Sequence, residues 1–407
     1  MSVEVHIEWE GETHFVGRLY TTERNPAVSF EYRPEWLSRA DAFAIDPTSL
    51  PLRSGAQHGP TLFGAMQDCG PDRWGRMLIS RAVRKKILDH KPYQDLDYTL
   101  ALDDASRIGA LRFRAQAEGS FLATRNVKIP PVIYLSALLN AADAVHGDTE
   151  TAKDLRFLLN QGSPLGGARP KSAVAFPDGQ LAIAKFPKPD DTRDIAAGEV
   201  LALTLAQKAG IRVAAHLLET VNGKGVSIIT RFDRVGTRRI PFLSGSSLLA
   251  LPQDEPGAYT LLADGIRQLG YDTAVELREL WRRLVFSLLT SNYDDHLRNH
   301  GFLMRAPGRW ALSPAYDLNP VPEIERTQTP KMPISEDQEE PTIAAALSAV
   351  SRFNLSLGEA QTILRDVLAA VSDWRKTGRR LRIKAATLDA YATAFEHPLM
   401  EEARKSC

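Results

Sequence analysis

The sequence predicts an α+β protein in two parts, a small β-rich N-terminal subdomain and then a bilobal domain whose C-terminal lobe is all helical. Residues 3–20 alternate between apolar and polar side chains, which is the period of a strand. Residues 172–186 contain two strand patterns joined by Pro-Asp-Gly, and nearly everything beyond residue 257 has a helical pattern. We therefore expect a subdomain at residues 1–134 and a second domain at residues 135–407, with an N-lobe at about 135–235 and a C-lobe at about 236–407.

The first part begins with a hairpin pattern in residues 3–20, with Gly11 near its turn. Residues 63–87 then have a helical pattern that places Trp74 and Leu78 on one face. Two short strands are expected at residues 98–104 and 109–113. Pro130 and Pro131 mark the connection to the second part.

The second part opens with a helical pattern at residues 135–159 and a glycine-rich stretch at residues 160–171. The strands of residues 172–186 are followed by a helix that ends at Gly210, because glycine readily takes the left-handed conformation that closes a helix. Asn222-Gly223 predicts a second hairpin turn. In the helical remainder we expect one more hairpin, at residues 301–313.

Composition excludes several classes of protein. The formal net charge of the 407 residues is zero, so no whole-molecule field attracts the chain to nucleic acid or to an anionic membrane. Cys69 and Cys407 lie far apart, which argues against a disulfide framework and fits a reducing compartment. No secretory leader is evident, and no apolar run approaches the roughly 20 residues that a membrane span needs. We expect a cytoplasmic protein without membrane contact.

The densest polar pattern, SNYDDHLRNHGFL, follows an apolar helical run at residues 280–289. Asp294 and Asn299 are separated by four residues, the spacing of the catalytic loop of protein kinases, where the aspartate orients the substrate hydroxyl. The hairpin that follows leads to Asp317, eighteen residues beyond Asn299. Amide and carboxylate oxygens are the hard ligands that Mg²⁺ prefers. The pattern therefore predicts a magnesium-dependent phosphoryl-transfer site.

Upstream residues supply the remaining parts of a nucleotide site. Lys185 shares a strand face with Leu181 and Ile183, so its amine is expected to need anions such as phosphates and a glutamate, for which Glu199 on the next helix is available. Glycines before the first strand allow backbone amides to approach phosphates, although the P-loop pattern is absent. Thr230, Arg231 and Phe232 follow the second hairpin where a hinge for adenine is expected.

Taken together, the segments resemble the HipA family of serine/threonine kinases, the toxins of bacterial HipA–HipB toxin–antitoxin pairs. The similar segments cover most of the chain: FGAMQDCGPDRWGRMLI, DDASRIGALRF, GSPLGGARPK, AIAKFPK, ITRFDR, NYDDHLRNHGF and LSPAYDL. The resemblance implies a kinase-like bilobal fold, with Asp294 as catalytic base, His296 as a brace of the catalytic loop, and Asn299 and Asp317 as magnesium ligands. It implies ATP contacts from Gly166, Gly167, Ala168, Arg169, Lys171, Lys185, Glu199, Thr230, Arg231 and Phe232.

The resemblance also implies partners. Known family members phosphorylate an aminoacyl-tRNA synthetase and arrest growth, and a small helix-turn-helix antitoxin, HipB, binds the kinase. DNA contact would then be indirect, through the antitoxin. One departure concerns the serine that is autophosphorylated in family members: Pro164 stands at its place here, with Ser163 beside it. Two alternatives remain open, a HipA-like kinase of another protein or small molecule without a toxin role, and a non-catalytic corepressor.

Ordinary structural explanations also remain open for single residues. Lys185 and Glu199 are compatible with plain solvated positions, and Asp294 and Asp295 with turn or cap residues. His296 and His300 have the spacing of a zinc pair, but Gly301 argues against a continuing helix. The basic run at residues 374–384 is typical of a solvated helix end, with contact to DNA or to an acidic antitoxin as the alternative.

Overall fold

The computed structural model describes residues 2–22, 25–89, 91, 93–115, 119–122, 129–160, 167–252, 255–338 and 340–407. The chain forms two compact units. The first contains Met1–Asp190, Val221–Gly223 and Ile228–Leu243, and the second contains Asp191–Thr220, Lys224–Ser227 and Ser244–Cys407. Residues 135–190 therefore belong to the same compact unit as residues 2–134, while the domain boundary at residue 134 stays a prediction.

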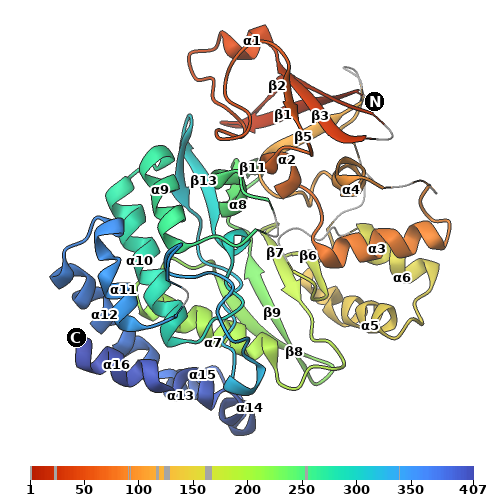
Figure 1. Ribbon diagram of the computed structural model, residues 1–407. Coiled ribbons are helices and arrows are strands. Elements are labelled where there is room, and N and C mark those ends of the chain that lie inside the picture. Colours follow the sequence, from red (N-terminus) through yellow and green to blue (C-terminus); the bar gives the residue numbers. More distant parts are fainter. Residues whose placement is uncertain are drawn as a thin grey trace. The chain divides into compact units, whose positions relative to one another are not determined.

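The first unit is built on a five-stranded antiparallel sheet in the order β4-β3-β2-β1-β5, drawn in red to orange in Figure 1. Its buried face carries Val5, Leu19 and Phe30. The predicted first hairpin is confirmed, because β1 and β2 pair around Glu10 and Gly11, which both have positive φ. The elements of this unit are β1 Ser2–Trp9, β2 Glu12–Thr22, β3 Asn25–Tyr32, α1 Pro34–Leu37, β4 Gln57–Gly59, α2 Gly64–Asp68, α3 Arg73–Arg84, α4 Asp95–Ala101, β5 Leu111–Arg114, η1 Val132–Tyr134, α5 Leu135–His146, α6 Ala152–Asn160, β6 Lys171–Ala175, β7 Leu181–Lys185, β10 Arg234–Val235 and β11 Arg238–Arg239.

Three expectations for this unit need correction. The strand expected at residues 98–104 is wrong: α4 occupies this region, because Gln94 and Asp97 form a capping box that starts a helix. The helix expected at residues 63–87 is two helices, α2 and α3, and Asp72 caps the second by accepting a hydrogen bond from Gly75 N at 2.8 Å. The helix expected at residues 135–159 is likewise interrupted after His146, where Asp148 has a φ of +55°.

A second sheet has the strand order β6-β7-β9-β8, and its strands are assigned to both units. Strands β6 and β7 pair in the first unit, and residues 228–230 of β9 (Lys224–Thr230) belong to the same unit. Most of β8 (His216–Val221) and the start of β9 belong to the second unit. The hairpin between β8 and β9 turns at Asn222 and Gly223 with φ of +50° and +78°, as the sequence predicts.

The second unit is mainly helical, and α10, the longest helix, packs against α9 and α12 (Figure 1). The expected β13–β14 hairpin lies among these helices. Leu280, Trp281 and Phe286 of α10 are buried in the core. The elements are α7 Ile195–Lys208, α8 Gly245–Leu249, α9 Tyr259–Leu269, α10 Thr273–Leu289, η2 Leu297–Asn299, β13 Gly301–Ala306, β14 Arg309–Leu312, η3 Glu323–Glu325, α11 Ile343–Ser348, η4 Val350–Phe353, α12 Leu357–Ser372, α13 Trp374–Arg380, α14 Ala385–Ala390, α15 Ala392–Phe395 and α16 Pro398–Ser406, and β12 Phe242–Ser244 spans the unit boundary.

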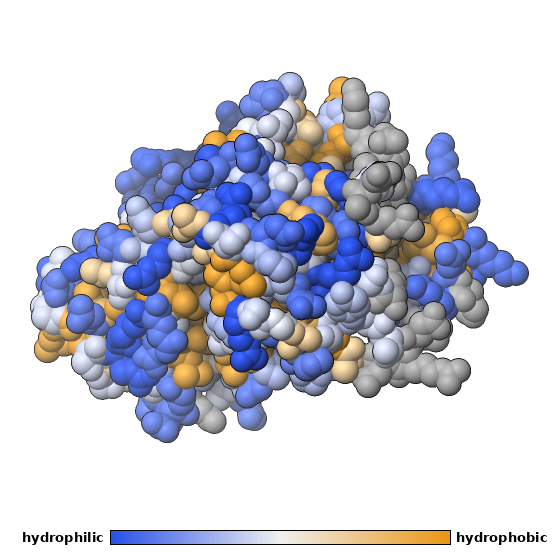
Figure 2. Space-filling model, turned by 90° about the horizontal axis from the view of Figure 1, so that it is seen from above, coloured by the Kyte–Doolittle hydropathy of each residue, from blue (hydrophilic) through white to orange (hydrophobic). Residues whose placement is uncertain are grey.

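The face of the molecule in Figure 2 is largely hydrophilic, with separate hydrophobic patches between the charged side chains. Scattered exposed apolar residues such as Ile133 and Ile324 are normal for a protein surface. Within the described residues, no helix combines the length and the apolar character that crossing a membrane requires.

Candidate active site

The predicted catalytic loop follows α10 directly and lies in the second unit. The helix ends at Leu289, and Ser291 takes a left-handed φ of +51° that turns the chain out of the helix. The loop then leads through Asp294 to η2, which ends at Asn299. The Asp294 side chain is 50% exposed and forms an ion pair with Lys331. The carboxylate assigned as catalytic base is thus accessible to a substrate.

The neighbouring acid, Asp295, is buried and holds the loop in place. It accepts hydrogen bonds from the Tyr259 hydroxyl and from Ser287 Oγ at 3.4 Å, and its Oδ2 lies 3.2 Å from His300 Nε2. Burial alone would raise the pKa of Asp295, but His300 and the hydrogen bonds hold that pKa below its usual value. Asp295 is therefore fully engaged inside the protein, while Asp294 faces outward.

Asn299 provides the test of whether this loop fits a magnesium ion. Its Nδ2 donates weakly to Asp294 O, at 3.4 Å, and its Oδ1 is buried with no hydrogen-bond partner in the described part of the chain. Buried polar atoms without partners are rare and call for an explanation. An amide oxygen is a suitable ligand for Mg²⁺, so the residue present fits the predicted ion.

The segment after the β13–β14 hairpin places Asp317 beside this loop. Val321 N donates to Ser291 O at 3.1 Å, and Asn319 N donates to Asn292 Oδ1 at 3.2 Å. The Tyr316 hydroxyl donates to Arg298 O at 2.6 Å. These bonds fasten both sides of Asp317 to the catalytic loop. The φ of Asp317 is +57°, a conformation that aspartate and asparagine tolerate better than most residues.

His296, the predicted brace, lies half-buried between these acids. Burial lowers its pKa most strongly, while Asp295, Asp317 and Asp294 act in the opposite direction. Its Nδ1 has no hydrogen-bond partner within the described ranges, and the bracing bonds seen in the loop belong to Asp295. Nowhere in the described residues do three or more His, Cys, Asp or Glu side chains form a group that could hold a metal. His300, the other half of the zinc alternative, contacts Asp295.

The first unit contains the predicted nucleotide-binding lysine. Lys185 ends strand β7 and is half-buried, and it lies directly opposite Lys171 of β6 in the antiparallel register. Paired residues of a sheet share one face, so the two amines project to the same side. Lys171 Nζ lies 2.7 Å from Asp72 Oδ2, with both side chains almost completely buried. Lys171 thus has a protein counterion, whereas its predicted contact with ATP stays a prediction.

Only the end of the predicted phosphate loop can be described. Gly166, Ser163 and Pro164 lie outside the described residues. Gly167 has a φ of +116°, and Gly167 and Ala168 are exposed, while Arg169 is half-buried. A Cβ at Gly167 would lie 3.1 Å from Lys171 Nζ, so a side chain is disfavoured there by both conformation and space.

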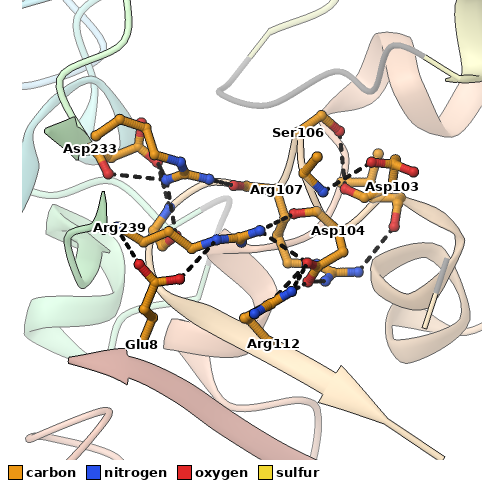
Figure 3. Close-up of polar contacts among 12 residues, drawn as sticks. Glu8, Asp103, Asp104, Ser106, Arg107, Arg112, Asp233 and Arg239 are labelled. Carbon is orange, nitrogen blue, oxygen red and sulfur yellow. Dashed lines mark hydrogen bonds and ion pairs between the residues drawn. The ribbon is translucent and has the colours of Figure 1, made fainter. Parts of the chain in front are cut away.

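The predicted hinge residues are fixed by a buried network of charges in the first unit. Arg231 forms a bidentate pair with Asp233 and donates to the carbonyls of Ser106 and Arg107, at 2.6 and 3.0 Å. The hydrogen bonds of the Arg231 guanidinium are therefore made to other groups of the protein. Phe232 is half-buried beside Phe242, with ring centroids 6.3 Å apart, and Thr230 ends β9. Figure 3 shows the same network extending from Asp233 to Glu8, Asp104 and Arg239.

Glu199, the predicted partner of Lys185, is buried in α7 of the second unit. Its carboxylate accepts a hydrogen bond from Ser227 Oγ at 2.9 Å. Since Lys185 belongs to the first unit, the pairing of the two residues stays a prediction.

Family models match both parts of the chain. Residues 9–114 match the HipA N-terminal domain, and residues 163–374 match the HipA-like C-terminal domain. The chain belongs to the HipA family. The predicted kinase-like α+β fold class is confirmed by a solved complex of HipA, HipB and operator DNA from Shewanella oneidensis. That similarity has a TM-score of 0.72 at 15% identity and covers 99% of this chain and 97% of the other.

Two curated relatives of this HipA-family chain are described as putative kinases. Y4dM of Sinorhizobium fredii is 30% identical over 159 residues, which is 38% of this chain and 36% of the relative. A protein of Haemophilus influenzae is 25% identical over 225 residues, which is 49% of this chain and 64% of the relative. The matched regions thus span less than two thirds of either relative.

Two residues of this HipA-family protein were missed by sequence reasoning. Lys331 forms an ion pair with Asp294, and its backbone N–H donates to Tyr293 O at 3.1 Å. Lys331 is distant from Asp294 in the sequence, so no local pattern indicates the pair. Asp72 pairs with Lys171. Its position just before Arg73-Trp74-Gly75 predicts a helix cap, and only the capping half of its role was detectable from the sequence.

Proposed function

We propose that this protein is an ATP- and Mg²⁺-dependent serine/threonine protein kinase of the HipA family. The observation that carries the proposal is the catalytic loop of the second unit. There, an exposed carboxylate and a buried amide oxygen without a hydrogen-bond partner stand five positions apart, at Asp294 and Asn299. Two curated relatives described as putative kinases support this assignment.

In this proposal each predicted site residue has a separate role in phosphoryl transfer. Asp294 accepts the hydroxyl proton of the substrate and orients the attacking oxygen. Lys185 and the glycine-rich segment bind the triphosphate, and Thr230, Arg231 and Phe232 line the adenine position with their backbone. Asn299 and Asp317 would hold Mg²⁺, which neutralises charge on the phosphates when bound. The protein contributes mainly by positioning the two reactants.

The biological role in this proposal is that of a toxin. A translation factor such as an aminoacyl-tRNA synthetase would be the substrate, and a HipB-like helix-turn-helix antitoxin would be the partner that contacts DNA. The similar complex from Shewanella oneidensis contains HipA, HipB and operator DNA, which supports this partner. The location of action would be the cytoplasm.

The catalytic part of the proposal is tested with γ-labelled ATP and a bacterial protein extract, with Mg²⁺ or with EDTA. We expect labelled phosphoserine or phosphothreonine only with Mg²⁺. The matched variant is Asp317→Asn, because asparagine accepts the left-handed φ of +57° while removing the charge. Calorimetry on this variant is expected to show a smaller gain in ATP affinity from Mg²⁺ than the wild type shows, because the negative charge on the ligand is lost. Wild-type protein that binds no ATP contradicts the assignment.

The toxin role is tested separately by inducing the wild-type protein and Asp294→Asn in a bacterium that lacks the antitoxin. Growth arrest with the wild type alone supports a toxin. Normal growth with an enzymatically active wild type points to a kinase without a toxin role.

A further inference from the structure

The N-terminal domain contacts the predicted phosphate loop through a buried ion pair. Lys171 ends this loop, and Asp72 is the N-cap of α3 in the N-terminal domain. The two charged atoms lie 2.7 Å apart, and the side chains are only 2% and 1% exposed. Removing both charges from water is costly, and such a pair often contributes little net stability compared with apolar residues of the same size. A role in positioning is therefore a better explanation than stability alone.

The register of β6 and β7 explains why a counterion is needed at this place. Lys171 and Lys185 are direct partners across the two strands. Like charges at directly opposite positions repel each other. Asp72 neutralises Lys171 and so lowers the repulsion that Lys185 experiences. The ion pair therefore reduces the repulsion between two lysines that project from the same face of the sheet.

Trp74, next to the same helix cap, fixes the backbone of the loop. Its N–H donates to Gly167 O at 3.4 Å, and its indole Nε1 donates to Lys171 O at 3.2 Å. On the other side, Phe186 N donates to Pro170 O at 2.9 Å. The end of the phosphate loop is thus bonded both to α3 and to the residue that follows Lys185.

The hinge is attached to the N-terminal domain independently of the loop. Asp233 Oδ2 accepts from Gly109 N at 2.7 Å, and Arg231 donates to the backbone of Ser106 and Arg107. Gly109 has a φ of +71°, and a Cβ there would lie 3.1 Å from Phe242 Cβ, so the close approach requires glycine. Both predicted nucleotide segments of the first unit therefore rest on the N-terminal domain.

We propose that the N-terminal domain is a structural part of the nucleotide site, in which Asp72 positions Lys171 and the end of the phosphate loop for the triphosphate. This inference rests on the proposed function, because it assumes that the site binds ATP. It assigns separate tasks to the two attachments. The contact of Asp72 with Lys171 positions the groups that bind the phosphates. The Asp233 network positions the hinge residues that bind the adenine.

The test compares the affinities for ATP with Mg²⁺ and for adenosine, which lacks phosphates, by calorimetry. Asp72→Asn is expected to weaken ATP binding by about 10- to 100-fold, the range for a lost hydrogen bond to a charged group, and to leave adenosine binding unchanged. Asp72→Glu is expected to recover most of the ATP affinity. The control is Asp95→Asn, because Asp95 pairs with Arg76 of α3 at 2.8 Å and has no bond to the described loop residues 167–171.

Equal ATP affinities of Asp72→Asn and Asp95→Asn overturn the inference, and so does an equal loss of ATP and adenosine binding. If Asp72→Asn does not fold, Trp74→Phe removes the indole bond to Lys171 O together with part of a buried ring, and the adenosine measurement reports any general loss of structure. A loss of about 2- to 10-fold for ATP alone is then expected, and no loss overturns the inference. A wild type that binds neither compound refutes the proposed function itself, so the two failures are distinguishable.

Discussion

The predicted site residues of the two units differ in how their polar groups are engaged. In the first unit, Arg231 and Asp233 are 0% and 1% exposed and form a bidentate pair, and Lys171 and Asp72 form a buried ion pair. In the second unit, Asp294 is 50% exposed in a surface ion pair, and Asn299 Oδ1 has no hydrogen-bond partner within the described residues. Arg231 of the first unit is thus held by other groups of the protein, whereas Asp294 and Asn299 of the second unit keep an exposed carboxylate and an amide oxygen without a hydrogen bond in the described residues.

The largest effect is expected where the second unit leaves a carboxylate accessible. Asp294→Asn removes the base, so kcat is expected to fall by about 10²- to 10⁴-fold. The melting temperature and the affinity for ATP should change little, because the pair with Lys331 is exposed and weak. Kinetics with labelled ATP and a thermal melt check both parts. A kcat near that of the wild type would remove Asp294 from the mechanism.

A large effect on stability, rather than on catalysis, is expected in the first unit. Asp233→Ala leaves the buried guanidiniums of Arg231 and Arg234 without their carboxylate, so the free energy of unfolding should fall by about 3–5 kcal/mol. Urea denaturation measures this. Asp41→Ala is the control, because its pair with Arg39 is exposed and should contribute less than about 1 kcal/mol. Similar losses for the two variants would contradict the role of the buried Asp233 network in holding this part of the first unit.

An intermediate effect is expected at Asn299, whose side-chain oxygen has no hydrogen-bond partner in the described residues. Asn299→Leu keeps a similar volume but offers no oxygen to the ion, so binding of ATP with Mg²⁺ should weaken by about 10- to 100-fold. Without Mg²⁺, the variant and the wild type should bind ATP equally. Calorimetry under both conditions checks this. A variant that still gains affinity from Mg²⁺ as the wild type does would show that Asn299 does not bind the ion.

The smallest effect concerns pH, at a histidine of the second unit away from the site. Burial lowers the pKa of His397 most strongly, Arg326 adds to this, and the contact of its Nε2 with Leu289 O, at 3.1 Å, opposes it. The pKa of His397 is thus lower in the folded chain than in the unfolded chain, whose pKa is about 6.5. Because the unfolded chain binds the proton more readily, the free energy of unfolding decreases as the pH falls through about 6.5. In His397→Gln the slope of stability against pH should be smaller, by at most about 1.4 kcal/mol per pH unit, the limit for one proton.

Urea denaturation of His397→Gln and the wild type at pH 7.5 and 5.5 measures that slope. Identical slopes would show that His397 carries its proton equally in both states.

Local chemistry made much of the fold predictable. Asn222 and Gly223 predicted their hairpin because few other residues accept two consecutive positive φ angles. The strand expected at residues 98–104 failed because its alternating residues belong to a helix that begins at the capping box of Gln94 and Asp97. Periodicity over seven residues was too short a signal to decide between the two.

The residues of the candidate site were likewise predictable only in part. Asp294 and Asn299 were predicted because kinase loops have a fixed local spacing, and the hairpin that follows extended the pattern to Asp317. The partner of Lys171 is 99 positions away in the sequence, and no periodicity reports such a distant pair. Arg231 was expected at the nucleotide through its position, while its side chain is committed to Asp233 by packing that only the folded chain reveals.

The opposed lysines of β6 and β7 have a practical consequence for chemical labelling. An ATP analogue with a reactive acyl phosphate transfers its acyl group to an amine near the phosphates. Lys171 is 2% exposed and engaged with an acid, whereas Lys185 is half-buried at the end of its strand. The reagent should therefore label Lys185 rather than Lys171, and peptide mapping would show which of the two amines is accessible from the nucleotide.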